Sequence, residues 1–208
     1  MYQKLDIETW NRKEHFLFFK QMEEPFFGIT ATIDCTATYA NAKILDVPFF
    51  IYYLHKTAVA VNTIESFRYR IVDNEVHVFD RIDVSATIMR NDNTFGFSLI
   101  QYAKDLSQFK SITQKEIERV QRTPGLFSHD FEPNVIHFSA LPWIDFTSLS
   151  HARSFTFPDS CPKISFGKMT ITEDGKRTMP ISIHVHHGLM DGFHVGQFLT
   201  LFQELMNQ

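Results

Sequence analysis

The spacing of apolar positions changes along the first third of the chain from helical to extended. Residues 12–22 place Phe16, Phe18 and Phe19 on the apolar side of a short predicted helix. Residues 27–35 alternate apolar and polar side chains and are rich in β-branched residues, which predicts a strand. Pro48 suits the first turn of a second helix, which we expect to reach about Asn62.

The rest of the chain alternates between the same two patterns. We expect three or four strands between residues 67 and 99, and a helix over residues 104–122 that a Thr-Pro-Gly sequence ends. Further strands are predicted over residues 135–140, 163–171 and 177–187, and a last helix over residues 193–206. This order predicts one layered α/β domain over residues 1–208.

Composition narrows the class of protein. The 208 residues include 22 phenylalanines, which suit a large core, a subunit interface or an aromatic pocket. The net charge of -4 gives no basic surface for nucleic acid. Cys35 and Cys161 are far apart, which favours a reducing compartment. The start of the chain lacks the apolar segment of a signal peptide, and no apolar run is long enough to cross a membrane. We therefore expect a cytoplasmic protein without membrane or nucleic-acid partners.

Four of the ten histidines lie between residues 184 and 194. Alternation along the predicted strand places His184 and His186 on one face, and His187 at the end of an apolar row on the other. The chain then turns at Gly188, and Asp191 stands where the cap of the last helix is expected.

Three interpretations of this cluster compete. His187 can be a half-buried edge histidine beside a capping aspartate. Alternatively, His184 and His186 can bind a metal together with His194 or Asp191, although no further ligand is identifiable. In the third interpretation His187 is a general base, because an imidazole fixed at the end of a buried strand can take a proton from an alcohol near neutral pH.

The sequence from His186 to Val195, His-His-Gly-Leu-Met-Asp-Gly-Phe-His-Val, resembles the active-site motif of coenzyme A-dependent acyltransferases. The longer string is similar to the form found in chloramphenicol acetyltransferases. In that family the second histidine, here His187, is the base. The resemblance continues near the start, where Trp-Asn-Arg-Lys-Glu-His-Phe (residues 10–16) is similar to a family segment. It implies an ion pair between Arg12 and Asp191.

Two later segments also resemble the family. Ser-Ala-Leu-Pro-Trp (residues 139–143) implies that the Ser139 hydroxyl donates a hydrogen bond to the oxyanion formed during acetyl transfer. Ser-Phe-Gly-Lys (residues 165–168) is similar to the family's Thr-Met-Gly-Lys, whose threonine holds a water near the transition state and whose lysine lies by coenzyme A. Contacts with coenzyme A are therefore expected at Trp143, Gly167 and Lys168.

The resemblance places the acceptor among phenylalanines. Phe18, Phe27 and Phe95 correspond to the lining of the antibiotic pocket, although core packing explains each equally well. Phe19 replaces a tyrosine that contacts chloramphenicol, and Phe97 replaces a small residue and should narrow the pocket. Glu23 stands where an apolar residue is expected, and residues 45–47 and 150–162 match the family poorly.

Taken together, the resemblance implies a two-layer α/β sandwich, in which helices cover a mixed β-sheet, assembled as a homotrimer with active sites between subunits. The implied activity is transfer of acetyl from acetyl-coenzyme A to the primary hydroxyl of chloramphenicol, a resistance function, with no metal. Three alternatives stay open: the same transfer to another small hydrophobic alcohol, a metal enzyme using His184 and His186, and a non-catalytic binding relative.

Overall fold

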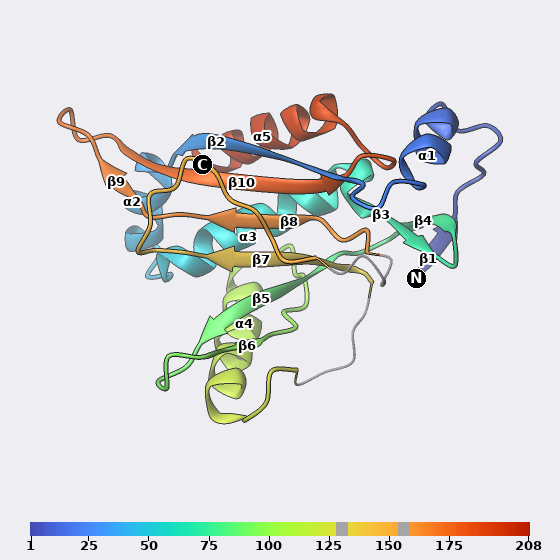
Figure 1. Cartoon of the computed structure of the whole chain (residues 1–208). Helices are drawn as coiled ribbons and strands as arrows, with labels where there is room; N and C mark the ends of the chain where they lie inside the picture. The colour runs from blue at the N-terminus through green and yellow to red at the C-terminus, as the bar shows by residue number, and fades with distance from the viewer. Residues whose placement is uncertain (128–132, 154–158) are drawn as a thin grey trace.

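A mixed β-sheet forms the centre of the molecule. The computed structural model describes residues 1–127, 133–153 and 159–208 (Figure 1). The main sheet contains seven strands in the order β2-β10-β8-β7-β5-β6, with β9 beside one end of β10. Its strands are β2 (Phe26–Asp34), β5 (Asp83–Met89), β6 (Phe95–Phe97), β7 (Val135–Ala140), β8 (Lys163–Phe166), β9 (Thr170–Ile171) and β10 (Arg177–His186). Strands β5, β7 and β8 are mutually parallel, and the other pairs are antiparallel.

Most helices lie along one face of this sheet, whereas α1 (Lys13–Phe19) lies beyond one end of it, as Figure 1 shows. The helices of the described residues are α1 (Lys13–Phe19), α2 (Thr36–Ile44), α3 (Phe49–Thr63), α4 (Leu106–Arg122), α5 (Gly192–Met206) and the 3-10 turn Glu65–Arg68. A separate three-stranded sheet, β1 (Tyr2–Lys4), β4 (Glu75–Phe79) and β3 (Tyr69–Val72), lies at the same end of the molecule as α1. The predicted α/β architecture, a mixed sheet covered by helices, is confirmed.

Alternation along the central strands separates an apolar face from a polar one. Phe138 of β7 and Phe166 of β8 point to the helices, with ring centroids 5.3 Å apart, and Phe202 of α5 packs on Phe166 at 5.6 Å. Ser139 follows Phe138 and Ser165 precedes Phe166, so both serines point to the opposite face, because side chains alternate with a period of two. The packing of the core thus decides which residues the polar face presents.

Most predicted elements are confirmed, with four differences. Strand β1 and helix α2 were not predicted; β1 has only three residues and α2 lacks a strong apolar stripe. The strand predicted over residues 163–171 is divided into β8 and β9 at Gly167, where a Cβ would lie only 2.5 Å from Cγ of Pro180. The strand predicted to reach His187 ends at His186.

Phe18 does not share the apolar side of α1 with Phe16 and Phe19. Its side chain is 60% exposed, whereas Phe16 is buried. The reason is helical geometry: Phe16 and Phe19 are three residues apart and lie on one face, while Phe18 is turned by about 200° from Phe16. In the described residues no single helix is long and apolar enough to cross a membrane; α2 and α3 reach that size only when counted together across a bend of 115°.

Candidate active site

His187 lies directly after β10, held between two aromatic rings. Its imidazole stacks on Phe19 of α1, with centroids 4.0 Å apart and planes 11° apart, and touches Phe27 of β2 at 4.6 Å. Its backbone N–H donates to the Pro25 carbonyl at 2.8 Å, which fixes the chain at this point. The imidazole Nδ1 is buried and has no hydrogen-bond partner among the described residues. These contacts hold the ring in one orientation.

Arg12 joins the beginning of the chain to the histidine motif, as predicted from the resemblance. Its Nη1 donates to Asp191 Oδ2 at 2.5 Å, and its Nη2 donates to the His187 carbonyl at 3.1 Å. The Arg12 residue is only 7% exposed, so these bonds form where water competes little. The guanidinium therefore fixes the backbone of His187 as well as the acid.

Asp191 also caps α5. Its Oδ1 accepts from the Phe193 backbone N–H at 3.0 Å and lies 2.9 Å from His194 Nδ1, while the backbone N–H of Asp191 lies 3.2 Å from the same nitrogen. Burial acts to raise the pKa of the Asp191 carboxyl, but its interactions with Arg12 and His194 outweigh it and lower the pKa to about 2. At neutral pH Asp191 is a carboxylate. The role of His194 in this arrangement was not predicted.

Within the described residues, His184 and His186 have neighbours other than the ligands considered for a metal site. His186 Nδ1 accepts the Gly188 N–H at 3.1 Å, and the His184 ring lies over Gly28, where a Cβ would be 2.2 Å from the imidazole Nε2. His194 faces Asp191 instead. Among the described residues no third ligand gathers around the pair.

The described residues bring together one group of potential metal ligands, which was not predicted: His137, Asp159 and Cys161. The Lys163 ammonium pairs with Asp159, and burial raises the pKa of the Cys161 thiol to about 11. A metal would have to displace a cation and deprotonate a buried thiol, so this group is better explained as a buried ion pair.

Ser139 lies in a pocket of about 440 Å³ on the polar side of the sheet. Of the residues expected at the site, Ser165, Phe95 and Trp143 line the same pocket. Phe95 is 46% exposed and Trp143 is 65% exposed, so both offer open aromatic surface. Phe97 does not line this pocket, because its ring is turned onto Phe127 with centroids 5.2 Å apart. Phe97 also packs on Phe95, which lines this pocket, with centroids 5.5 Å apart, and its effect on the acceptor stays a prediction.

The turn after β8 packs against the segment that carries Trp143. The Lys168 N–H donates to the Ile144 carbonyl at 2.8 Å, and the Gly167 N–H donates to Pro180 at 2.9 Å. A Cβ on Gly167 would lie 2.7 Å from the Ile144 carbonyl oxygen, so glycine permits this close approach. Trp143 lines the pocket with an open indole, and the backbone of the exposed Lys168 is bonded to the same segment one residue further along.

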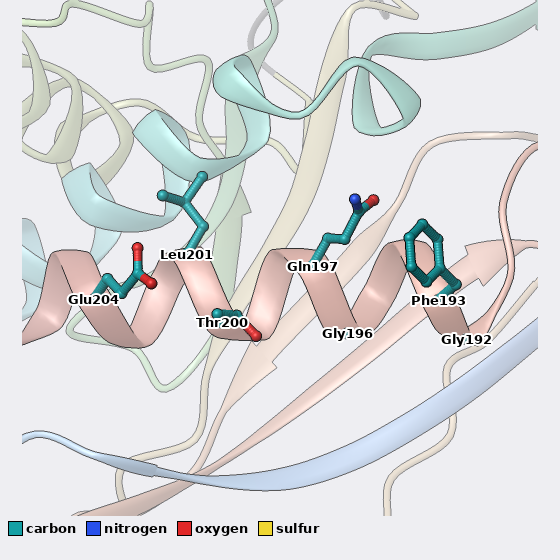
Figure 2. A pocket seen from close by; sticks show the side chains of 7 residues that line it. All are labelled: Gly192, Phe193, Gly196, Gln197, Thr200, Leu201 and Glu204. Atoms are coloured by element: carbon teal, nitrogen blue, oxygen red, sulfur yellow. The ribbon is translucent and has the colours of Figure 1, made fainter.

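A second hollow lies on the outer surface of α5 and contains none of the predicted site residues. Figure 2 shows its lining along one side of the helix, with the side chains of Phe193, Gln197 and Leu201 beside the bare backbone at Gly192 and Gly196. It is a surface feature separate from the pocket that contains Ser139.

Comparison with known proteins places these observations in a family. A family model described as chloramphenicol acetyltransferase matches residues 1–203. The chain belongs to the chloramphenicol acetyltransferase family. It is 32% identical over 209 residues to chloramphenicol acetyltransferase 3 of Escherichia coli, covering 99% of this chain and 97% of the relative. Chloramphenicol acetyltransferase 2 of Haemophilus influenzae is 28% identical over 202 residues, with 96% and 94% covered.

A solved structure of a chloramphenicol acetyltransferase aligns with a TM-score of 0.92 at 30% identity, covering 99% of this chain and 100% of the other. A dihydrolipoamide acetyltransferase of Azotobacter vinelandii aligns with a TM-score of 0.67 at 14% identity, over 94% and 86% of the two chains, which shows a shared fold alone. The family match therefore covers almost the whole chain, and the fold is shared with acyltransferases outside the family.

Within this chloramphenicol acetyltransferase fold, the two groups expected to act on the reaction lie far apart in one chain. Ser139 pairs with Ser165, and Ser165 pairs with Ser182, so Ser139 lies two strands, about 10 Å, from β10. His187 follows Ser182 by five residues, which adds about 16 Å along β10. The two Cα atoms are thus about 19 Å apart, and one chain cannot bring both side chains to the same atom.

The depressed pKa of Asp191 predicts how acid affects stability. Asp191→Asn keeps an oxygen that can cap α5 but removes the charge that binds Arg12, and we expect it to lower the free energy of unfolding by about 1.5 to 3 kcal/mol at pH 7. Because the folded-state pKa of about 2 lies below the usual 3.8, the stabilisation by the carboxylate is complete above pH 4 and is lost as the pH falls toward 2.

Urea unfolding of both proteins between pH 7 and pH 2 measures this difference directly. The two stabilities should converge below pH 4. A constant difference across the range would contradict the assigned ion pair.

Proposed function

We propose that this chain is a chloramphenicol O-acetyltransferase, which transfers acetyl from acetyl-coenzyme A to the primary hydroxyl of chloramphenicol. The observation that carries the proposal is membership of the chloramphenicol acetyltransferase family over residues 1–203. The ordered surroundings of His187 and the pocket around Ser139 supply the groups that this reaction needs. Such an activity would serve as chloramphenicol resistance.

His187 acts as the general base. Stacking on Phe19 and the fixed backbone hold the imidazole, and we assign proton transfer to Nε2 because Nδ1 is buried. The base takes the proton of the acceptor hydroxyl as its oxygen forms a bond to the acetyl carbon. The carbon–sulfur bond then breaks, and the protonated His187 returns its proton to the departing thiolate.

Ser139 stabilises the negative charge that forms on the acetyl oxygen. Its hydroxyl is a neutral donor on a rigid strand, so it is in place before the charge develops. Acetyl-coenzyme A supplies the reactive thioester. The open indole of Trp143 at the pocket suits its aromatic part, and the exposed cation of Lys168 suits its anionic part. Because Gly167 has no Cβ, the turn that carries Lys168 can lie close to the segment that carries Trp143.

We also propose that the active protein is a homotrimer in which His187 of one chain meets the Ser139 pocket of the next. The support is the separation of about 19 Å within one chain, which only a second chain can close. A ring of three identical head-to-tail contacts would create three equal sites.

Transfer to a different hydrophobic alcohol is the second candidate, favoured by one observation. The side chain stacked on His187 is Phe19, which offers a flat apolar surface and no hydroxyl to bind a polar substituent. The same chemistry would then act on an acceptor with fewer polar groups near the reacting oxygen.

Replacing the base should abolish most turnover while leaving binding nearly unchanged. His187→Ala should lower kcat by about 10² to 10⁴ or more, because the hydroxyl loses its proton acceptor. His15→Ala, an exposed histidine on α1, is the control and should retain full activity. Release of free thiol from acetyl-coenzyme A gives the rates; near-normal turnover by His187→Ala would exclude this residue as the base.

A site shared between chains predicts complementation between two inactive variants. In trimers assembled from equal amounts of His187→Ala and Ser139→Ala chains, roughly a quarter of the sites combine an intact His187 with an intact Ser139. Mixed expression should therefore restore roughly a quarter of the wild-type activity. Light scattering should give about three times the chain mass of 24.3 kDa. A fully active monomer, or no restoration in verified mixed assemblies, would contradict the shared site.

The acceptor is tested by competition at equal concentration. We expect acetyl transfer to chloramphenicol to exceed transfer to a panel of other small hydrophobic alcohols. Because Phe19 lacks the hydroxyl of the tyrosine it replaces, the KM for chloramphenicol should be up to about a hundred-fold higher than is usual in the family. Phe19→Tyr should then lower the KM for chloramphenicol. Efficient transfer to another alcohol without transfer to chloramphenicol would keep the enzyme class and replace the substrate.

A further inference from the structure

A histidine outside the motif enters the pocket that contains Ser139. His151 belongs to the segment after Trp143, and it lines this pocket together with Ser139 and Ser165. Its Nε2 lies 3.4 Å from the Ser165 hydroxyl oxygen, the limit of hydrogen-bond distance. Nothing in the sequence pattern marked His151, because the segment from 150 to 162 matches the family poorly.

The His151 ring packs against the His184 ring. It meets the His184 ring edge to face, with centroids 4.9 Å apart and planes at 90°. His184 is only 6% exposed, and its ring lies directly over Gly28, where no Cβ fits. Gly28, His184, His151 and Ser165 thus form a continuous contact from β2 to the pocket wall. This support restricts the positions that His151 can take.

Both imidazoles are neutral at physiological pH. Burial above all, and after it the neighbouring His184 ring and the positive charges of Lys163 and Arg153, lowers the pKa of His151 to about 4. Burial likewise lowers the pKa of His184 to about 4. A neutral imidazole can donate or accept one hydrogen bond at Nε2 without adding charge beside the reacting atoms.

Ser165 has a competing neighbour. Its Cα pairs with Ser182 on one side and with Ser139 on the other. The Ser182 hydroxyl is buried and has no partner among the described residues, so it could attract a Ser165 hydroxyl that was free to turn. A serine side chain has three staggered positions, and the contact with His151 selects one of them.

We propose that His151 is a positioning residue for acetyl transfer, which fixes the Ser165 hydroxyl beside Ser139 and acts through it. The proposal rests on the proposed acetyltransferase function, in which Ser165 holds a polar group near the reacting atoms. His151 itself need not touch the substrate. Its removal should therefore lower turnover more than it weakens binding.

A double-mutant cycle separates this role from simple packing. His151→Leu should reduce kcat with chloramphenicol by about ten- to a hundred-fold with less than about a threefold change in KM. In a Ser165→Ala background the same substitution should cause almost no further loss, because the hydroxyl that it positions is absent. His151→Gln, which restores a polar group at similar reach, should recover much of kcat. Ala152→Ser, an exposed neighbour, is the control for disturbance of the segment.

Additive losses in the cycle, or equal kcat for the Leu and Gln variants, would overturn the proposal. Melting temperature and assembly mass are measured for each variant, and if the Leu variant fails to assemble, the Gln variant with and without Ser165→Ala decides the question. Less than additive losses with recovery by Gln support it.

The contact is also tested without any acceptor. In protein labelled with ¹³C-histidine, the His151 Cε1–H signal, identified by its loss in His151→Gln, should shift in Ser165→Ala and stay unchanged in Ala152→Ser. An unshifted signal would overturn the contact. If the wild-type protein transfers no acetyl to chloramphenicol, the proposed substrate is wrong. The NMR measurement still tests the contact between His151 and Ser165 in that case. The double-mutant cycle is then measured with the alcohol that the panel identifies.

Discussion

The site depends most on one buried guanidinium. Arg12 bonds to the Asp191 carboxylate at the start of α5 and to the His187 carbonyl at the end of β10, so it ties the first helix to the last two elements. Breaking a buried ion pair by removing one partner leaves an uncompensated charge, which costs about 3 to 5 kcal/mol where burial is complete. Because α1 also carries Phe19, the same interaction sets the ring that stacks on His187. The hydrogen bonds of Arg12 therefore set both the orientation of His187 and the position of the Phe19 ring that stacks on it.

The rest of the site is set by the core behind it. Phe138 and Phe166 interlock with Phe202 of α5, and this packing fixes the register of β7 and β8. A slip of one residue would turn Ser139 into the core and Phe138 into the pocket. The cost of burying a hydroxyl and exposing a phenylalanine prevents such a slip. The core thus fixes the backbone positions of Ser139 and Ser165, while the direction of each hydroxyl depends on its neighbours in the pocket.

Local pattern was sufficient to predict the main strands and helices, because their apolar spacing is strong. It predicted neither β1 nor α2, since a three-residue strand and a helix with a weak stripe leave little periodic signal. The pairing of Arg12 with Asp191 followed from family resemblance alone; no local pattern joins residues 179 positions apart. His151 could not be found by either route, because its position depends on how an irregular segment folds back onto the sheet.

The distribution of exposed aromatic surface adds an argument for assembly. Trp143 and Phe95 leave large apolar areas open at the Ser139 pocket, and Phe18 does so on the helix that carries Phe19. Open aromatic surface in water is unfavourable unless a ligand or another chain covers it. We infer that an assembly joining the His187 side of one chain to the Ser139 pocket of the next would cover both areas and create the hydrophobic space for the acceptor. The phenylalanine content would then serve the core, the subunit contact and the pocket together.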